Sequence, residues 1–394
     1  QFGPPRTLNV GETVVLTVGQ TNPSTTDQIF VDYGGLASDV RVGHRVLLNE
    51  GLIELQVVGV EGDSVSCRVE VGGTLEGGKK VNLPDSLVSA PVFTDKDRSD
   101  LAAALEAGVD YVSQSFVKAA ADVLAVQSMI PDDSGVKVIA KIEKAWALKG
   151  VDEIIEAADG VMVARGDLGA EVPVEDLPLL QKDLIEKCNR VGKPVITATQ
   201  MLKSMVDDAR PTRAESSDVA NAILDGTDAI MLSEETAVGR FPVRAVSTMA
   251  RIAEKAESRA RPGTSLDGLG APAGGSVTEA ISRAVCSLAK NLGARAIITP
   301  TESGLTPRMV ARCRPKVPIV AFSRTQKVVN QLALVWGVSA FLTDASPSIE
   351  GMVEDAVSRA VSAGIVSKNE TVVITAGVQK DVPGTTNLIK VDQV

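Results

Sequence analysis

A lysine and two carboxylates stand at the ends of two short apolar runs. Lys141 and Glu143 close the run 137–143, and Asp167 follows the run 160–166. Alternate side chains of a strand share a face, so Lys141 and Glu143 should point together. Two hard oxygen ligands suit Mg²⁺, and a lysine beside them can balance the charge of a transferring phosphoryl group. The alternative is a structural Lys–Glu pair with a helix cap.

Further candidates follow at similar junctions. The stretch 166–169, Gly-Asp-Leu-Gly, sits between an apolar run and a helical segment, where backbone N–H groups can bind carboxylate or phosphate. Thr199 ends the run 193–200 and could orient a substrate carboxylate or a proton-carrying water. A helix N-cap is the alternative for Thr199. Arg213 is a candidate phosphate or subunit contact, with an ordinary surface arginine as the alternative.

Parallel βα units are predicted to position these residues. Beyond residue 91, apolar runs alternate with amphipathic stretches such as 96–107 and 177–191, the pattern of strands covered by helices on their faces. The five predicted strands cover 110–116, 137–143, 160–166, 193–200 and 228–235. Polar residues end every run, and the carboxyl ends of parallel strands are where such folds build their sites.

The chain divides into three predicted domains: 1–88, 89–258 and 259–394. The first has short apolar runs separated by Gly, Asn and Asp, which indicates an all-β domain. The stretch 256–276 is rich in Gly, Pro, Ser and Ala and reads as a linker. The last domain is predicted to be α/β, with helices at 277–292, 307–313, 325–337 and 349–363 and strands at 294–299, 317–322, 371–376 and 386–391.

Composition narrows the possible partners. The 394 residues carry a net charge of −10, and no stretch concentrates Lys and Arg, which argues against nucleic acid or an anionic membrane surface as partner. No apolar run reaches the roughly 18–20 residues of a membrane span. The cysteines lack the spacing of a metal site, so reduced thiols in a cytoplasmic protein are expected. They are Cys67, Cys188, Cys286 and Cys313.

A series of motifs resembles the pyruvate kinases in order and spacing. They are AKIE (140–143), ARGDLG (164–169), ITATQM (196–201), RPTRAE (210–215), DVANA (218–222), DGTDAIMLS (225–233) and GTTN (384–387). The resemblance implies a (β/α)8 barrel of the TIM type, a β-rich lid inserted after the third barrel strand, and a C-terminal α/β domain. It also implies transfer of a phosphoryl group from phosphoenolpyruvate to ADP, which yields pyruvate and ATP.

The resemblance assigns roles residue by residue. Lys141 resembles the lysine that bridges the phosphoryl group, and Glu143 and Asp167 resemble the ligands of a catalytic Mg²⁺ or Mn²⁺. Thr199 resembles the threonine that helps to protonate the enolate. The phosphoenolpyruvate site would also include Ala164, Arg165 and Gly166.

Other implied sites lie elsewhere. Arg213 resembles an arginine near the active site at a subunit contact of a homotetramer. Lys79 and Arg6 are placed near the nucleotide, ADP or ATP. A loop after the predicted strand 294–299 resembles one that binds a sugar-phosphate or nucleotide effector, with an ordinary strand–helix turn as the alternative. Its candidate residues are Thr301, Ser303, Gly304 and Thr306.

The chain also departs from the family pattern. The family places three βα units before the lid, carrying a phosphate-binding arginine and the K⁺ ligands, whereas residues 1–6 resemble a shortened trace of the last such motif. An incomplete barrel of about five units is therefore expected, without K⁺ ligands, and unstable or inactive by itself. One alternative is a fragmentary homologue that retains only effector binding or assembly. Another is a Mg²⁺-dependent aldol lyase, which would lack the lid and the C-terminal domain.

Overall fold

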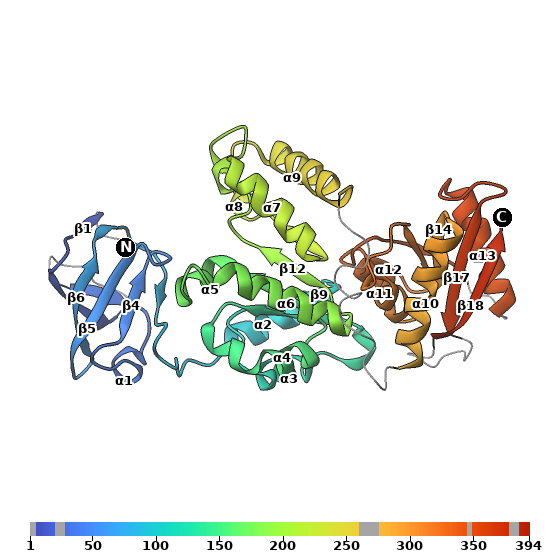
Figure 1. Ribbon diagram of the computed structural model, residues 1–394. Helices are drawn as coiled ribbons and strands as arrows, with labels where there is room; N and C mark the ends of the chain where they lie inside the picture. Colours follow the sequence, from blue (N-terminus) through green and yellow to red (C-terminus); the bar gives the residue numbers. More distant parts are fainter. Residues whose placement is uncertain (1–4, 20–27, 260–275, 345–348, 378–385) are drawn as a thin grey trace.

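Three sheet-containing regions follow one another along the molecule (Figure 1). The computed structural model describes residues 5–19, 28–259, 276–344, 349–377 and 386–394. The N-terminal β region, hereafter the lid, lies at one end, a parallel sheet with its helices lies in the middle, and the C-terminal sheet lies at the other end. This order agrees with the sequence-based division into β-rich, βα and α/β regions.

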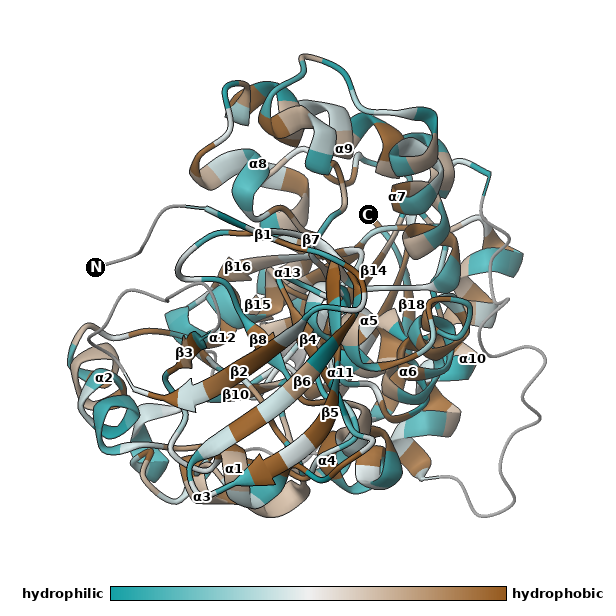
Figure 2. Cartoon of the chain, turned by 90° about the vertical axis from the view of Figure 1, so that its left-hand side faces the viewer, coloured by the Kyte–Doolittle hydropathy of each residue, from teal (hydrophilic) through white to brown (hydrophobic). Residues whose placement is uncertain are grey.

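The lid is built on a six-stranded sheet of order β3-β2-β6-β5-β4-β8, with a separate β1–β7 pair. Along β5 the side chains of Ile53, Leu55 and Val57 are buried, whereas those between them are only partly covered, so one face makes the core. Figure 2, coloured by hydropathy, shows hydrophobic residues alternating with more hydrophilic ones along much of β5 and β6. The elements are β1 (Arg6–Leu8), β2 (Thr13–Val18), β3 (Gln28–Val31), α1 (Leu36–Asp39), β4 (Arg45–Leu48), β5 (Ile53–Glu61), β6 (Ser64–Val71), β7 (Gly73–Leu75) and β8 (Val81–Asn82).

The middle region holds the five predicted strands, all parallel, in the order β13-β12-β11-β10-β9. They are β9 (Tyr111–Gln114), β10 (Lys137–Ile142), β11 (Gly160–Ala164), β12 (Val195–Ala198) and β13 (Ala229–Met231). The helices are α2 (Asp95–Glu106), α3 (Ala120–Gln127), α4 (Val151–Ala157), α5 (Arg165–Glu171), α6 (Leu177–Val191), α7 (Arg213–Asp225), α8 (Glu234–Ala237) and α9 (Pro242–Glu257). Each strand is shorter than its predicted run because the last residues of the run lie in the following loop or helix, and β9, β12 and β13 also begin one or two residues later than predicted.

The three central strands, β10, β11 and β12, are buried on both faces. One face packs with the helices in a cluster that includes Val138, Val161 and Leu184. The other carries a smaller cluster of Ile139, Met162, Ile196 and Ala198, with Leu334 from the C-terminal region packed against it. Burial on two faces is the physical reason why these strands read as continuous apolar runs.

The C-terminal sheet has the order β16-β15-β14-β17-β18, with β18 antiparallel to β17. Its elements are α10 (Val277–Leu292), β14 (Ala296–Pro300), α11 (Leu305–Ala311), β15 (Ile319–Ser323), α12 (Gln326–Leu332), β16 (Val338–Leu342), α13 (Ile349–Ser362), β17 (Thr371–Gly377) and β18 (Thr386–Gln393). The edge strand β16 was not predicted, and the helix predicted over 325–337 ends at Leu332.

The linker predicted between the middle and C-terminal regions begins with helical residues. The linker predicted over 256–276 is wrong at its start because α9 continues through Glu257; residues 260–275 lie outside the described residues. All four cysteines are free thiols, as expected. Among the helices described, none is both long and apolar enough to cross a membrane.

Candidate active site

Lys141 and Glu143 form an ion pair at the carboxyl end of β10. The Nζ of Lys141 lies 2.7 Å from Oε1 of Glu143 and donates to Oγ of Ser115 at 2.7 Å. Only 2% of the Glu143 side chain is exposed. Its other oxygen, Oε2, accepts the backbone N–H of Phe116 at 2.8 Å. Pairing on both oxygens explains how this buried carboxylate is tolerated.

Phe116 adopts an uncommon backbone conformation that belongs to this arrangement. Its φ of +57° lies in the left-handed region, which is costly for a bulky side chain. The residue follows β9, and its N–H is the one that reaches Glu143. Sequence reasoning missed this backbone contact, and its only signal was the polar Ser115 at the end of the predicted strand.

Asp167 lies in the first turn of α5, directly after β11. Its two carboxylate oxygens accept from Nζ of Lys80, a lid residue, at 2.9 and 3.0 Å. Burial acts to lower the pKa of Lys80, but the hydrogen bond and charge of Asp167, with Glu143 and Glu50 nearby, hold that pKa above its ordinary value. Asp167 is thus the hydrogen-bond partner of this ammonium group, and the charge of Glu143 also acts on it. Because β10 and β11 pair in parallel, Lys141, Glu143 and Asp167 gather at one end of adjacent strands.

Thr199 follows β12 and connects it to α5. Its Oγ1 accepts the backbone N–H of Gly166 at 2.7 Å and donates to the carbonyl of Ala198 at 2.6 Å. Thr199 and Gln200 both have positive φ, +71° and +54°. Thr199 is the N-cap residue of neither neighbouring helix, so the alternative of a helix N-cap is wrong. Its hydroxyl instead accepts a backbone N–H in the first turn of the neighbouring α5.

The side chain of Arg165 is committed to protein partners. It donates to Oδ1 of Asp218 at 2.7 Å, to the carbonyl of Thr199 at 2.8 Å and to Oε1 of Gln181 at 3.2 Å. Only 10% of it is exposed. Ala164, which precedes it, is the buried last residue of β11. These contacts indicate that the Arg165 side chain positions Thr199 and α5.

Two predicted residues pair within the lid, and a third is exposed. In the lid, Lys79 pairs with Glu76 at 3.2 Å and Arg6 pairs with Glu12 at 2.6 Å. Arg213 is the exposed first residue of α7. None of the three forms a hydrogen bond or ion pair with Lys141, Glu143 or Asp167 among the described residues. The lid lysine that reaches the site is Lys80, which sequence reasoning missed.

The predicted effector loop joins β14 to α11. Gly304, with φ of +76°, donates its N–H to Oγ1 of Thr301 at 3.0 Å. The hydroxyl of Thr306 is buried and forms a 2.7 Å hydrogen bond with that of Thr386. Ser303 is half-buried in the same loop. The described contacts of Thr301 and Thr306 are therefore internal to the C-terminal region.

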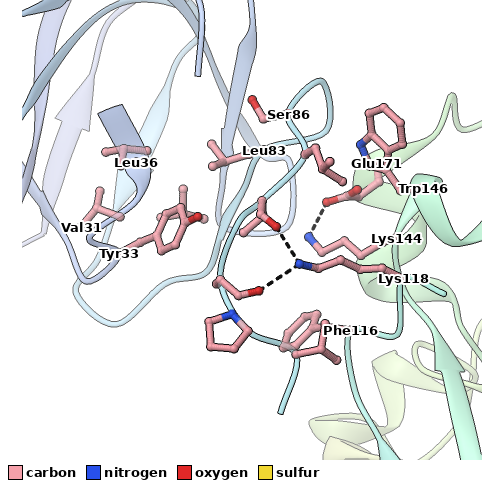
Figure 3. Close-up of a pocket in the computed structure, with 16 residues that line it drawn as sticks. Val31, Tyr33, Leu36, Leu83, Ser86, Phe116, Lys118, Lys144, Trp146 and Glu171 are labelled. Atoms are coloured by element: carbon pink, nitrogen blue, oxygen red, sulfur yellow. Dashed lines mark hydrogen bonds and ion pairs between the residues drawn. The ribbon is translucent and has the colours of Figure 1, made fainter. Parts of the chain in front are cut away.

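A pocket of about 250 Å³ lies at the junction of lid and middle region (Figure 3). Lys118 reaches across it and donates to the carbonyls of Val88 and Ala90 at 2.6 and 2.9 Å. Lys144 pairs with the buried Glu171 at 2.5 Å. These charged residues follow β9 and β10 or lie in α5, so they share the strand ends with the candidate site. Through its two hydrogen bonds, Lys118 holds the segment that connects the lid to α2.

The carboxylates at the strand ends could serve as ligands of a divalent metal. Glu143 and Asp167 offer two hard carboxylates, each now balanced by a lysine. No group of three or more His, Cys, Asp or Glu side chains within the described ranges could hold a metal. Mg²⁺ commonly uses one or two carboxylates, with substrate oxygens and waters as the other ligands. The residues present fit such an ion.

Comparison with known proteins identifies the family. Residues 3–246 match the family model described as pyruvate kinase, barrel domain, and residues 279–392 match pyruvate kinase, alpha/beta domain. The two matches cover the lid with the middle region and the C-terminal region.

Curated relatives agree with the family models. The chain is 46% identical to a pyruvate kinase of Geobacillus stearothermophilus, 42% identical to one of Clostridium acetobutylicum and 47% identical to pyruvate kinase 2 of a Synechocystis species. These alignments cover 98%, 98% and 92% of this chain and 66%, 82% and 61% of the relatives. The chain thus spans less than two thirds of the length of two of these three relatives. With the resemblance extending over nearly all of its residues and both family models matched, the chain belongs to the pyruvate kinase family.

Proposed function

We propose that the protein transfers the phosphoryl group of phosphoenolpyruvate to ADP, using Lys141, Glu143 and Asp167. The observation that supports this proposal is that the Lys141–Glu143 ion pair and Asp167 lie at the same end of two adjacent parallel strands. Family membership supports it as well, because the relatives are named pyruvate kinases.

Each residue has a physical role in this proposal. Glu143 and Asp167 would hold a divalent metal, which supplies positive charge to the substrate oxygens when it is bound. Lys141, 24% exposed beside Glu143, is placed to offset charge on the phosphoryl group and on the enolate left behind. Thr199 is positioned by Arg165 and would orient the group that protonates the enolate.

Finer features of the proposal rest on the family resemblance. They are a homotetramer with Arg213 near a subunit contact, a phosphorylated effector bound at 301–306, a nucleotide near Lys79 and Arg6, a K⁺ requirement and a cytoplasmic location. The exposed position of Arg213 is compatible with a subunit contact. The domain boundaries 88/89 and 258/259 are part of the same proposal.

The test is pyruvate formation from phosphoenolpyruvate and ADP in the presence of Mg²⁺. We expect Lys141→Met to lower turnover by about 10²- to 10³-fold, the usual effect of removing one group that stabilises developing charge. Lys137→Met is the matched control because Lys137 lies at the opposite end of β10 and pairs with Asp159 at 3.1 Å. We expect it to retain turnover within about twofold.

Turnover that survives Lys141→Met would contradict the proposal. Absence of turnover in the unsubstituted chain would agree with the expectation that an incomplete barrel is inactive by itself. If binding of Mn²⁺ and the enolate analogue oxalate is retained, the result would also favour the alternative of a homologue that only binds ligands.

A further inference from the structure

Lys80 forms an ion pair with Asp167, one of the two candidate metal ligands. Its Nζ donates to both oxygens of Asp167, so one ammonium group occupies the whole carboxylate. The Lys80 side chain is 55% exposed, and that of Asp167 is 14% exposed. The lysine lies between β7 and β8, so this contact joins the lid to the middle sheet.

The other contacts of the lid described below involve neither Glu143 nor Asp167. Asn82 donates to Oε1 of Glu171 at 3.3 Å, and Gln200 donates to Oε2 of Glu50 at 3.5 Å. Lys118 holds the connecting segment through two backbone carbonyls, as Figure 3 shows. Among these contacts of the described residues, the Lys80–Asp167 pair is the one that a metal on Asp167 would disturb.

A divalent cation and an ammonium group compete for the same carboxylate oxygens. Both are attracted to Asp167, and they repel each other when they share it. We infer that Lys80 is a counter-ion carried by the lid, which a divalent metal must displace from Asp167, so that metal binding and lid docking oppose each other at this residue. This inference rests on the proposed role of Glu143 and Asp167 as metal ligands.

The opposition must be reciprocal. If docked Lys80 lowers the affinity of the site for metal, bound metal lowers the occupancy of the Lys80–Asp167 contact by the same factor. The remaining contacts, through Asn82 and Lys118, would keep the lid attached while Lys80 is released. The free ammonium group would then be available to an anionic group of a ligand between lid and sheet.

The chain supplies a matched control for this inference. Lys79 is the preceding residue, carries the same charge and pairs with Glu76 inside the lid. Removing either lysine changes the net charge equally, but only one substitution frees Asp167. A difference between the two variants therefore reports the contact and not the overall charge.

The first experiment measures Mn²⁺ binding to the full 394-residue chain by the electron paramagnetic resonance signal of free Mn²⁺. We expect Lys80→Met to bind Mn²⁺ about two- to fivefold more tightly than the unsubstituted chain, the range set by an ion pair whose lysine is about half exposed. Lys79→Met should match the unsubstituted chain. An affinity of Lys80→Met that is unchanged or weaker would overturn the inference.

The second experiment follows amide hydrogen exchange over residues 78–82 with and without Mn²⁺. We expect Mn²⁺ to speed exchange there in the unsubstituted chain and in Lys79→Met, because Lys80 leaves Asp167. In Lys80→Met exchange should be fast already and insensitive to Mn²⁺. Saturation with Mn²⁺ that leaves exchange unchanged in the unsubstituted chain would contradict the displacement.

Glu143→Gln distinguishes a failure of the inference about Lys80 from a failure of the proposed metal ligands. If this substitution weakens Mn²⁺ binding but Lys80→Met behaves like Lys79→Met, the inference about Lys80 fails while the proposed metal ligands stand. If Glu143→Gln leaves Mn²⁺ binding unaltered, the proposed ligand pair and the inference built on it both fail.

Discussion

At the scale of single residues, the candidate site is an arrangement of paired charges. Glu143 and Glu171 are almost wholly buried, and each carboxylate contacts a lysine. Desolvation of a lone carboxylate costs several kcal/mol, whereas pairing and hydrogen bonds offset much of that cost. The pairs therefore hold charges at the strand ends where a polar ligand could exchange for one partner.

Arg165 illustrates a charged residue that acts through its neighbours. Its guanidinium joins the Asp218 carboxylate and the Thr199 carbonyl, a fork that a single ammonium group cannot reproduce. We expect Arg165→Lys to lower the free energy of unfolding by about 1–3 kcal/mol. Urea denaturation checks this. Arg190→Lys, which alters an exposed pair with Glu186, should cost less than about 0.5 kcal/mol. Equal losses in the two variants would contradict the special role of Arg165.

At the scale of elements, helix α7 is anchored at its first turn. Thr212 and Glu215 form a capping box, and Glu215 also accepts from the backbone N–H and the hydroxyl of Ser204 at 2.6 and 2.5 Å. One carboxylate thus joins the start of α7 to the turn that follows β12. Burial acts to raise the pKa of Glu215, but these hydrogen bonds outweigh it and hold the pKa below its ordinary value.

The lowered pKa of Glu215 predicts a pH dependence. A depressed folded-state pKa adds stability above the unfolded-state value of about 4.3, and this stability is lost as pH falls through the folded-state pKa. We expect Glu215→Gln, which can keep the capping geometry, to be less stable than the unsubstituted chain at pH 7 by about 1 kcal/mol. The difference in urea midpoint between Glu215→Gln and the unsubstituted chain should become smaller below about pH 4. A gap that stays constant with pH would show that the charge contributes nothing.

At the scale of the whole molecule, Arg314 connects the C-terminal region to the middle region. It donates to Oδ1 of Asp228 at 3.0 Å, to Oδ1 of Asn189 at 2.8 Å and to the carbonyl of Gly226 at 2.5 Å. The backbone N–H of Trp336 also donates to Asp228. The ion pair is largely buried, with 12% and 5% of the two side chains exposed.

Breaking this connection should destabilise the protein strongly. We expect Arg314→Met to cost about 3–5 kcal/mol because it leaves Asp228 buried without its cation. The double variant Arg314→Met/Asp228→Asn should cost less than the sum of the single changes. Thermal and urea denaturation measure both, and Arg295→Met, at an exposed pair with Glu370, is the control. Additive losses would contradict the coupling of Arg314 with Asp228.

Local signals explain which elements could be predicted from the sequence. Helices α6 and α10 have the predicted bounds, because each has an apolar stripe and a glycine in the left-handed conformation after its last residue, Gly192 and Gly293. Strand β16 escaped prediction because it is an edge strand with partly exposed side chains. Because its side chains are not buried on both faces, the strand lacks the burial that made the central strands recognisable as apolar runs.

The sequence by itself determined the family, the order of the β, βα and α/β regions, and the strand ends that carry Lys141, Glu143 and Asp167. The regions and strand ends follow from the spacing of apolar residues, which is a local signal, and the family follows from motifs that are each a few residues long. Only the tertiary structure decided that Lys80 and not Lys79 meets Asp167, and that Arg314 meets Asp228. Neighbouring lysines are equivalent in local propensity, so their partners depend on how the chain brings distant segments together.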